Sequence, residues 1–188
     1  VALWTGNATA RSIPLNFSPD FVWGKDRTGG GNHNIYDIVR GANIELRSNS
    51  TMADRTNTQG LTSFDSNGFS LGTGADSDLN LTGRATVAWC WDAGTSTVTN
   101  TQGSITSSVR ANASAGFSIV TYTGTGGTAT VGHGLGVAPS LVLIKERSPN
   151  ADNWNVYHIS LGNQLWLQLN TTAAQQGPSS DMWNSTSP

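Results

Sequence analysis

The chain has 188 residues, of which only 12% are charged, and a net charge of −2. This length allows one large domain or two small ones, and either could bury a hydrophobic core. The weak charge gives no basis for a nucleic-acid or anionic-membrane partner, and no apolar run approaches the ~20 residues of a membrane-spanning helix. We therefore expect no nucleic acid and no membrane among the partners.

The composition is that of a β protein with many turns. Glycine supplies 22 residues, and Ser, Thr and Asn are also abundant. Gly and Asn adopt the positive φ that tight turns need, and Thr favours strands. The single cysteine, Cys90, excludes an internal disulfide, so packing and hydrogen bonds must hold the fold. Position 1 is Val rather than Met, which indicates a processed product or a piece of something longer.

Short strands separated by turns are predicted throughout the first half of the chain. Apolar and polar residues alternate in these segments, and Gly, Pro, Asn and Asp separate them. In chain order, the predicted elements are Trp4–Phe17 (a short strand and turn), Phe21–Lys25, Asn34–Val39, Asn43–Arg47, the two arms of Ser63–Leu71, and Ala85–Trp91. A short helix could begin at Met52.

The most apolar of these segments is Ala85–Trp91, ATVAWCW. Strand alternation places Val87, Trp89 and Trp91 on one face, and Ala88 and Cys90 on the other. We predict that Val87, Trp89 and Trp91 face the core. Cys90 is expected to be a small packed residue rather than a reactive thiol.

The second half begins with the Thr/Ser/Asn-rich segment Ala93–Ala115, in which Ser104–Val109 predicts a surface strand. Strands then follow at Phe117–Tyr122, around Thr130 and at Leu141–Lys145. A glycine-rich reversal and a proline corner at Pro139 separate them.

The chain also carries an internal duplication at a spacing of about 120 residues. Three stretches of the first copy match three of the second, the middle one without a gap: Trp4–Ile13 with Tyr122–Val131, Pro19–Arg27 with Pro139–Arg147, and Asn34–Ala53 with Asn155–Ala174. The only two lysines, Lys25 and Lys145, align with each other.

We therefore expect an all-β fold, an antiparallel β-sandwich of jelly-roll or lectin-like type with an internal duplication. Residues 1–94 form the first β repeat unit, 95–115 a connecting segment, and 116–188 a second, shorter unit. The second copy has no counterpart of Gly68–Trp91. Two arrangements stay open: one pseudo-symmetric sandwich over 1–188, or a full sandwich followed by a truncated one whose open edge a neighbouring chain covers.

No enzyme motif is present. The glycine-rich stretches lack the Gly-Lys-Ser/Thr of a phosphate loop, Gly132–Gly136 is not the dinucleotide fingerprint, and no nucleophile elbow occurs. The three histidines lack zinc-site spacing. The only two glutamates, Glu45 and Glu146, lie at non-equivalent repeat positions, which disfavours a paired-carboxylate glycosidase. We expect the protein not to be an enzyme.

Two loops contain residues that could offer oxygen ligands to Ca²⁺: Asp65, Asn67, Asp76 and Asp78. Their spacing does not match an EF-hand, and Asp-Ser-Asn-Gly is an ordinary turn sequence. Turn roles are therefore favoured over a metal site, and no other cofactor is expected.

Four residues of the second copy are candidates for glycan binding. Trp154 and Trp166 could stack on sugar rings, and Lys145 and Arg147 lie at i and i+2, on one face of a strand. The simpler interpretation is burial for the two tryptophans and a solvated strand end for the two cations.

Several long motifs, in this order, carry a family resemblance: Trp-Thr-Gly-Asn, Pro-Asp-Phe-Val-Trp-x-Lys-x-Arg, Asp-x-Val-Arg-Gly, Phe-Asp-Ser-Asn-Gly-Phe-Ser-Leu-Gly, Val-Ala-Trp-Cys-Trp, Gly-Phe-Ser-Ile-Val-Thr-Tyr-Thr-Gly and Val-Gly-His-Gly-Leu-Gly-x-Ala-Pro. Over nearly its whole length the chain resembles an uncharacterised β-rich repeat domain of predicted tail-fibre and other virion proteins of marine tailed bacteriophages. It departs from that pattern at Gly24, where the family usually has a β-branched residue.

This resemblance implies a structural or adhesive component of the virion surface, outside the cell. The expected function is a tail-fibre or capsid-decoration module that acts as an oligomer, with copies of itself and other virion proteins as partners. The alternative is a lectin-like adhesion module that recognises a host-surface polysaccharide.

Overall fold

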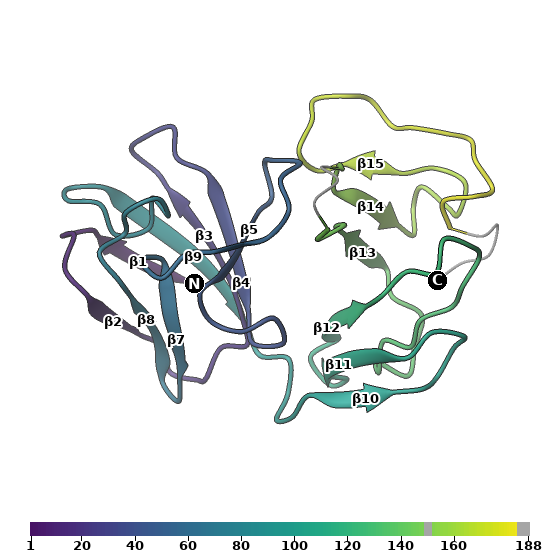
Figure 1. The fold of residues 1–188 in the computed structure, drawn as a ribbon, viewed down its shortest axis with the longest axis horizontal. Helices are drawn as coiled ribbons and strands as arrows, with labels where there is room; N and C mark the ends of the chain where they lie inside the picture. The colour runs from purple at the N-terminus through teal and green to yellow at the C-terminus, as the bar shows by residue number, and fades with distance from the viewer. Residues whose placement is uncertain (149–151, 184–188) are drawn as a thin grey trace. The chain divides into compact units, whose positions relative to one another are not determined.

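The computed structural model describes residues 1–148 and 152–183, and all regular structure in these ranges is β (Figure 1). The prediction of an all-β, antiparallel fold is confirmed. The chain forms two compact units. Unit 1 comprises Val1–Ser48 and Asp54–Thr95, and unit 2 comprises Asn49–Ala53 and Ser96–Pro188.

A search of the described residues finds no helix with the length and apolar character that crossing a membrane requires.

Unit 1 contains two antiparallel sheets. The larger has the strand order β1-β9-β3-β4-β5-β6, and the smaller has the order β2-β8-β7 (Figure 1). The strands are β1 (Ala2–Thr5), β2 (Arg11–Pro14), β3 (Phe21–Asp26), β4 (His33–Asp37), β5 (Ile44–Arg47), β6 (Arg55–Thr56), β7 (Leu61–Asp65), β8 (Gly68–Leu71) and β9 (Ala85–Trp91). The helix considered at Met52 does not form, and extended chain leads from there into β6.

Alternation along the strands gives each sheet of unit 1 one face directed at a shared core. In β3, for example, Val22 is fully buried while its neighbours Phe21 and Trp23 are only half-buried. Both sheets contribute to the core, whose buried members are Ala2, Ile13, Val22, Tyr36, Leu61, Phe69, Leu71, Leu79 and Ala88. Unit 1 is therefore a β-sandwich.

The orientation predicted for β9 is wrong. Its bounds agree with the prediction, but Ala88 is fully buried and Cys90 packs against the core, while Trp89 is 41% and Trp91 37% exposed. Val87 is buried at 9% exposure, on the same face as the two tryptophans. The core already holds the rings of Tyr36 and Phe69, so small side chains fit on the inner face of β9 and indoles do not.

The long connection between β8 and β9 lies against the core. The Trp4 indole Nε1 donates to the Leu79 carbonyl at 2.8 Å, and Asn80 Nδ2 donates to two backbone carbonyls, of Thr9 and Gly72. Leu79 is fully buried beside Gly24, where an added Cβ would lie 2.6 Å from Leu79 Cδ2. Gly24 therefore makes room for Leu79.

The described residues of unit 2 form two three-stranded antiparallel sheets, in the orders β10-β11-β12 and β13-β14-β15. The strands are β10 (Val98–Asn100), β11 (Ser107–Asn112), β12 (Phe117–Tyr122), β13 (Leu141–Ile144), β14 (Asn155–His158) and β15 (Leu167–Gln168). The segment 95–115, expected to connect the two units through a surface strand at Ser104–Val109, supplies β10 as well as β11, which overlaps the predicted strand. Its β-branched alternation directs Val109 inward, opposite Val120 of β12, and Val109 is 1% exposed.

The pairing registers confirm the internal duplication. The β13–β14 ladder repeats the β3–β4 ladder pair by pair, so that Phe21↔Asp37 corresponds to Leu141↔His158, Val22↔Tyr36 to Val142↔Tyr157, Trp23↔Ile35 to Leu143↔Val156, and Gly24↔Asn34 to Ile144↔Asn155. A one-residue slip would have turned every side chain to the opposite face. The two hairpins therefore keep the same core-facing residues.

The correspondence continues through the next strands. Ile35↔Leu46 between β4 and β5 becomes Val156↔Leu167 between β14 and β15, and Glu45↔Arg55 becomes the isolated bridge Trp166↔Gln176. It ends at β9. Strand β3 pairs with β4 on one edge and with β9 on the other, whereas β13 has β14 as its only paired strand in the described part of the chain.

We predict that Phe69→Ala lowers the free energy of unfolding of unit 1 by about 3–5 kcal/mol, because it removes a fully buried ring and leaves a cavity. The matched variant Trp89→Ala removes a larger but exposed ring and should cost about 1 kcal/mol. Denaturant unfolding followed by circular dichroism measures both. Equal costs for the two variants would contradict the observed orientation of β9.

Candidate binding face

The most prominent surface feature of unit 1 is a set of aromatic side chains on the outer face of its six-stranded sheet. Strands β3 and β9 are neighbours, with Trp23 opposite Trp89 and Phe21 opposite Trp91. Residues directly opposite in an antiparallel pair point to the same face. The inner face holds Val22, so the four aromatic rings project outward together. We call Phe21, Trp23, Trp89 and Trp91 the aromatic face.

The rings of the aromatic face contact each other edge to face. The centroids of Trp23 and Trp89 are 6.4 Å apart with an interplanar angle of 65°, and those of Phe21 and Trp91 are 5.5 Å apart at 74°. On the neighbouring strand β1, Leu3 is 67% exposed. Such contacts hold the rings in place, so the face presents apolar surface to solvent in a fixed geometry.

A cation and a histidine border the aromatic face. Lys25 follows Trp23 by two residues in β3 and lies opposite His33, and its Nζ donates to the Gly31 carbonyl at 2.7 Å. Burial and the positive charge of Lys25 lower the pKa of His33, which keeps the imidazole neutral at pH 7. The face therefore combines apolar rings with hydrogen-bonding groups at one end.

The loop beside this end is held by Asp26. Its carboxylate accepts hydrogen bonds from Thr28 N at 2.8 Å, Thr28 Oγ1 at 3.0 Å and Gly29 N at 3.1 Å, and Arg84 binds it at 2.9 Å. Burial alone would raise the pKa of Asp26, but these hydrogen bonds and the Arg84 charge outweigh it and lower the pKa. Asp26 is therefore ionised at neutral pH and orders the loop.

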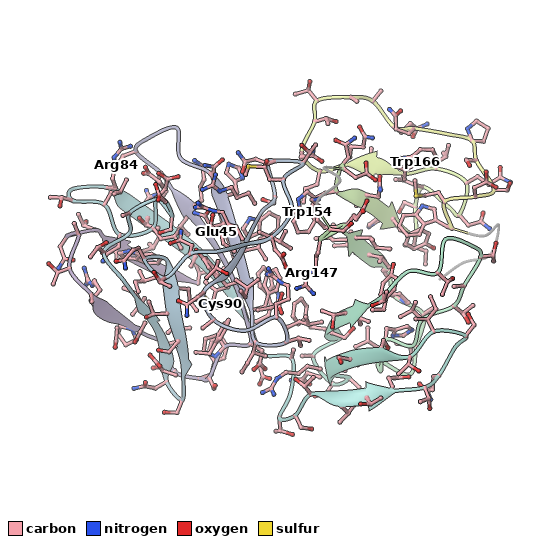
Figure 2. All side chains as sticks on the ribbon, in the orientation of Figure 1. Glu45, Arg84, Cys90, Arg147, Trp154 and Trp166 are labelled. Carbon is pink, nitrogen blue, oxygen red and sulfur yellow. The ribbon has the colours of Figure 1, made fainter. Side chains whose placement is uncertain are left out.

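A second carboxylate, Glu45, lies inside unit 1 with its side chain fully buried (Figure 2). It accepts from four side chains: Tyr36 Oη at 2.6 Å, Arg47 Nε at 2.8 Å, Asn57 Nδ2 at 2.9 Å and Arg55 Nε at 3.0 Å. Burial and the Glu45 charge raise the pKa of Tyr36 well above its usual value, so the phenol stays a donor. A carboxylate with this many donors and no exposed surface stabilises the fold rather than meeting a substrate.

The structure does not bring the four candidate Ca²⁺ ligands together. Asp65 and Asn67 precede β8, and Asp76 and Asp78 follow it, so the two pairs are separated along the strand by on the order of 10 Å. Asp65 accepts from Ser63 and Ser70 Oγ, and Asp78 accepts from Asn32 N. Asp76 and Asp78 have φ of 63° and 60°. These residues serve turns, and Asp65, Asp76 and Asp78 do not gather as a group that could hold a metal ion.

The four candidate glycan contacts also separate. Trp154 is 5% exposed and offers no open ring face, and Trp166 is half-buried with its backbone bridged to Gln176. Figure 2 places Trp166 well apart from Trp154 and Arg147. Lys145 follows β13 and donates to the Glu146 carbonyl at 2.6 Å. Trp154 is therefore a buried residue. The sequence analysis did not predict the aromatic face, because it assigned the indoles of β9 to the core.

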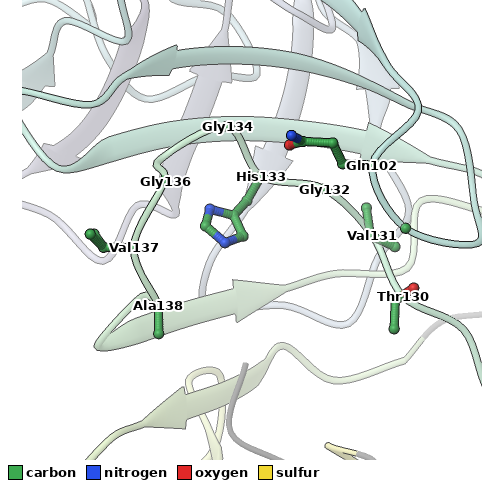
Figure 3. A pocket seen from close by; sticks show the side chains of 10 residues that line it. Gln102, Thr130, Val131, Gly132, His133, Gly134, Gly136, Val137 and Ala138 are labelled. Atoms are coloured by element: carbon green, nitrogen blue, oxygen red, sulfur yellow. The ribbon is translucent and has the colours of Figure 1, made fainter.

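A shallow, open depression in unit 2 is lined by Gln102, Gly103 and residues 130–134 and 136–138 (Figure 3). Its one titratable side chain is His133, whose Nδ1 accepts from Leu135 N at 3.2 Å. A side-chain hydrogen bond to the backbone two residues further on is typical of a polar turn residue. In residues 1–148 and 152–183 no three His, Cys, Asp or Glu side chains gather as a metal site would require.

Cys90 packs beside the core of unit 1, and burial raises the pKa of its thiol to about 11. The thiol is therefore protonated at neutral pH and a poor nucleophile.

We predict that Glu45→Gln destabilises unit 1 by about 2 kcal/mol, since it leaves the partly buried Arg47 and Arg55 without the counter-charge of a fully buried carboxylate. The exposed Glu146 is the matched control, and Glu146→Gln should change stability by no more than about 0.5 kcal/mol. Denaturant unfolding measures both. If Glu45→Gln proved neutral, the buried carboxylate would not be what holds β4, β5 and β6 together.

The chain belongs to the family described as "Domain of unknown function (DUF7483)", whose sequence profile matches residues 1–188. Comparison with curated proteins and with solved structures gives no match.

Proposed function

We propose that this member of the DUF7483 family is a structural module of a bacteriophage virion surface, a tail-fibre or capsid-decoration component that works within an assembly. One observation carries the proposal. Unit 2 repeats the β3–β5 strands of unit 1 in the same register, but its described residues form no strand at the position of β9. A repeated scaffold with one incomplete copy is suited to linkage with other subunits.

The charged groups of unit 1 support a scaffold role. Asp26, Asp37 and Glu45 are all buried, and each is paired with an arginine. None of these carboxylates is open to a substrate. The family resemblance described above supplies the virion setting, and low charge with exposed apolar side chains fits a protein that buries surface against partners.

Adhesion to a host-surface polysaccharide is the second candidate function, and the aromatic face favours it. Trp89 is 41% exposed and rests against Trp23, with Lys25 and its bound carbonyl nearby. An aromatic ring fixed on a sheet can stack on the apolar face of a sugar, while bordering polar groups bind its hydroxyls. The proposed glycan site is therefore the aromatic face of unit 1, in place of the predicted Trp154 and Trp166.

The assembly proposal is tested on virions. An antibody raised against the purified chain is applied to intact particles of the phage that encodes it, and gold label is counted by electron microscopy. We expect label at regular positions on the tail or capsid, and none on particles pre-incubated with unlabelled antibody. Particles that carry no label, when the same antibody detects the purified chain, would refute a virion-surface role.

The adhesion proposal is tested by binding of purified host-surface polysaccharide, followed through tryptophan fluorescence. We expect Trp89→Ala to weaken binding about fivefold or more, because stacking contributes of the order of 1 kcal/mol or more per aromatic ring. Trp166→Ala is the matched control and should bind as the parent chain does. Equal loss in both variants, or saturable binding that neither variant affects, would rule out the aromatic face as the site.

A further inference from the structure

Strand β13 is an edge strand made entirely of apolar residues. Leu141, Val142, Leu143 and Ile144 carry no charge, and Leu141 is 55% exposed. Natural edge strands are usually protected by charges, prolines or bulges against pairing with other chains. None of these devices occurs within β13. An unprotected apolar edge of this kind is a site for strand addition.

The hydrogen bonding shows which backbone groups face this edge. Ile159 N donates to the Ser140 carbonyl at 2.9 Å, on the β14 side. Backbone groups alternate between the two edges of a strand, so Val142 and Ile144 direct theirs at β14, and Leu141 and Leu143 direct theirs at the opposite edge. No second strand pairs with Leu141 or Leu143 among the residues that the structure describes.

Unit 1 shows what occupies the equivalent edge. Strand β3, whose register with β4 is the register of β13 with β14, is covered on its other edge by β9 over six residues, Phe21 to Asp26. The phase is also the same, because Ile38 N donates to the Asp20 carbonyl as Ile159 N does to that of Ser140. The edge that β9 covers in unit 1 is therefore the edge that β13 leaves open in unit 2.

The repeat also specifies the chemistry of the missing strand. In the register of β9, the residues opposite Leu141 and Leu143 would be large and apolar, as Trp91 and Trp89 are, and the residue opposite Ile144 would be small, as Ala88 is. The strand would run antiparallel to β13. Ile144 is the equivalent of Gly24. In unit 1 the side chain of Leu79 fills the space beside Gly24, whereas in unit 2 the side chain of Ile144 itself takes up that space. No counterpart of the Leu79 loop is needed.

We propose that the β13 edge is an acceptor site for an extended segment with the β9 pattern, donated by a partner chain of a different sequence. The proposal rests on the assembly role above and names what unit 2 binds. A second copy of this chain is not the donor, since each β9 is already paired on both edges, with β1 and with β3. Main-chain hydrogen bonds would supply affinity, and the alternating side chains would supply specificity.

The test uses a fluorescent peptide with the sequence of residues 84–92, carrying Cys90→Ser, added to the full chain. Binding is followed by fluorescence anisotropy, and amide protection by hydrogen exchange. We expect saturable binding, with slowed exchange at Leu141 and Leu143. Methylation of the peptide backbone nitrogen at Trp89, which faces β3 in unit 1, should weaken binding about tenfold or more. Methylation at Ala88, which faces β1, is the matched control and should weaken it less.

Variants of the acceptor complete the test. Leu143→Pro removes an N–H that points away from β14 and should abolish peptide binding, while Leu143→Val keeps the donor and should bind within about twofold of the parent. No binding, or protection outside residues 141–144, would overturn the proposal, as would self-association of the chain that Leu143→Pro abolishes. Peptide binding by a chain absent from virions would instead refute the proposed function and leave the acceptor site standing.

Discussion

Backbone pairing along both edges of β3 is the constraint on which the architecture of unit 1 depends. With β4 on one side and β9 on the other, β3 brings the N-terminal third of the chain together with a strand more than sixty residues later. The resulting sheet fixes which residues point inward, and so determines both the core around Val22 and Phe69 and the outward position of Trp23 and Trp89. Gly24 has no side chain, and the side chain of Leu79, from the loop between β8 and β9, occupies the space beside it.

The two copies of the hairpin keep the same pairing register although the side chains around them differ. Tyr36 and Tyr157 occupy equivalent positions, and both are almost completely buried. Around the first lies a network of charged side chains centred on Glu45, while the ring of the second contacts Trp183 edge to face at 5.5 Å. The two copies therefore share the backbone ladder and the alternation of side chains, but the groups that pack around the buried tyrosine differ.

Local pattern and repetition made much of the fold predictable. The bounds of β9 and β12, and the equivalence of Phe21–Lys25 with Leu141–Lys145, follow from alternation and from an ungapped match. The direction in which β9 faces could not be read in the same way. Both of its faces are apolar, and the choice between Trp89 and Ala88 as the inward residue depends on how much space Tyr36 and Phe69 leave, which is a property of distant parts of the chain.

For the same reason the aromatic face was missed and Trp154 was offered as a surface residue. A strand was predicted at Ser104–Val109, where β11 forms, but as a surface element. The burial of Val109 could not be read from the sequence because the strand is mostly polar.

The position held by Glu45 in the first hairpin is held by Trp166 in the second, and the facing Arg55 by Gln176. One copy of the repeat thus relies on an ionised group in its interior at a point where the other has an uncharged one. Hydration of ions weakens as temperature rises, so the cost of burying an ion pair falls on heating. The two copies of the repeat therefore respond differently to temperature at this point, because the buried pair of unit 1 becomes less costly on heating, whereas the equivalent position of unit 2 has no charge to desolvate.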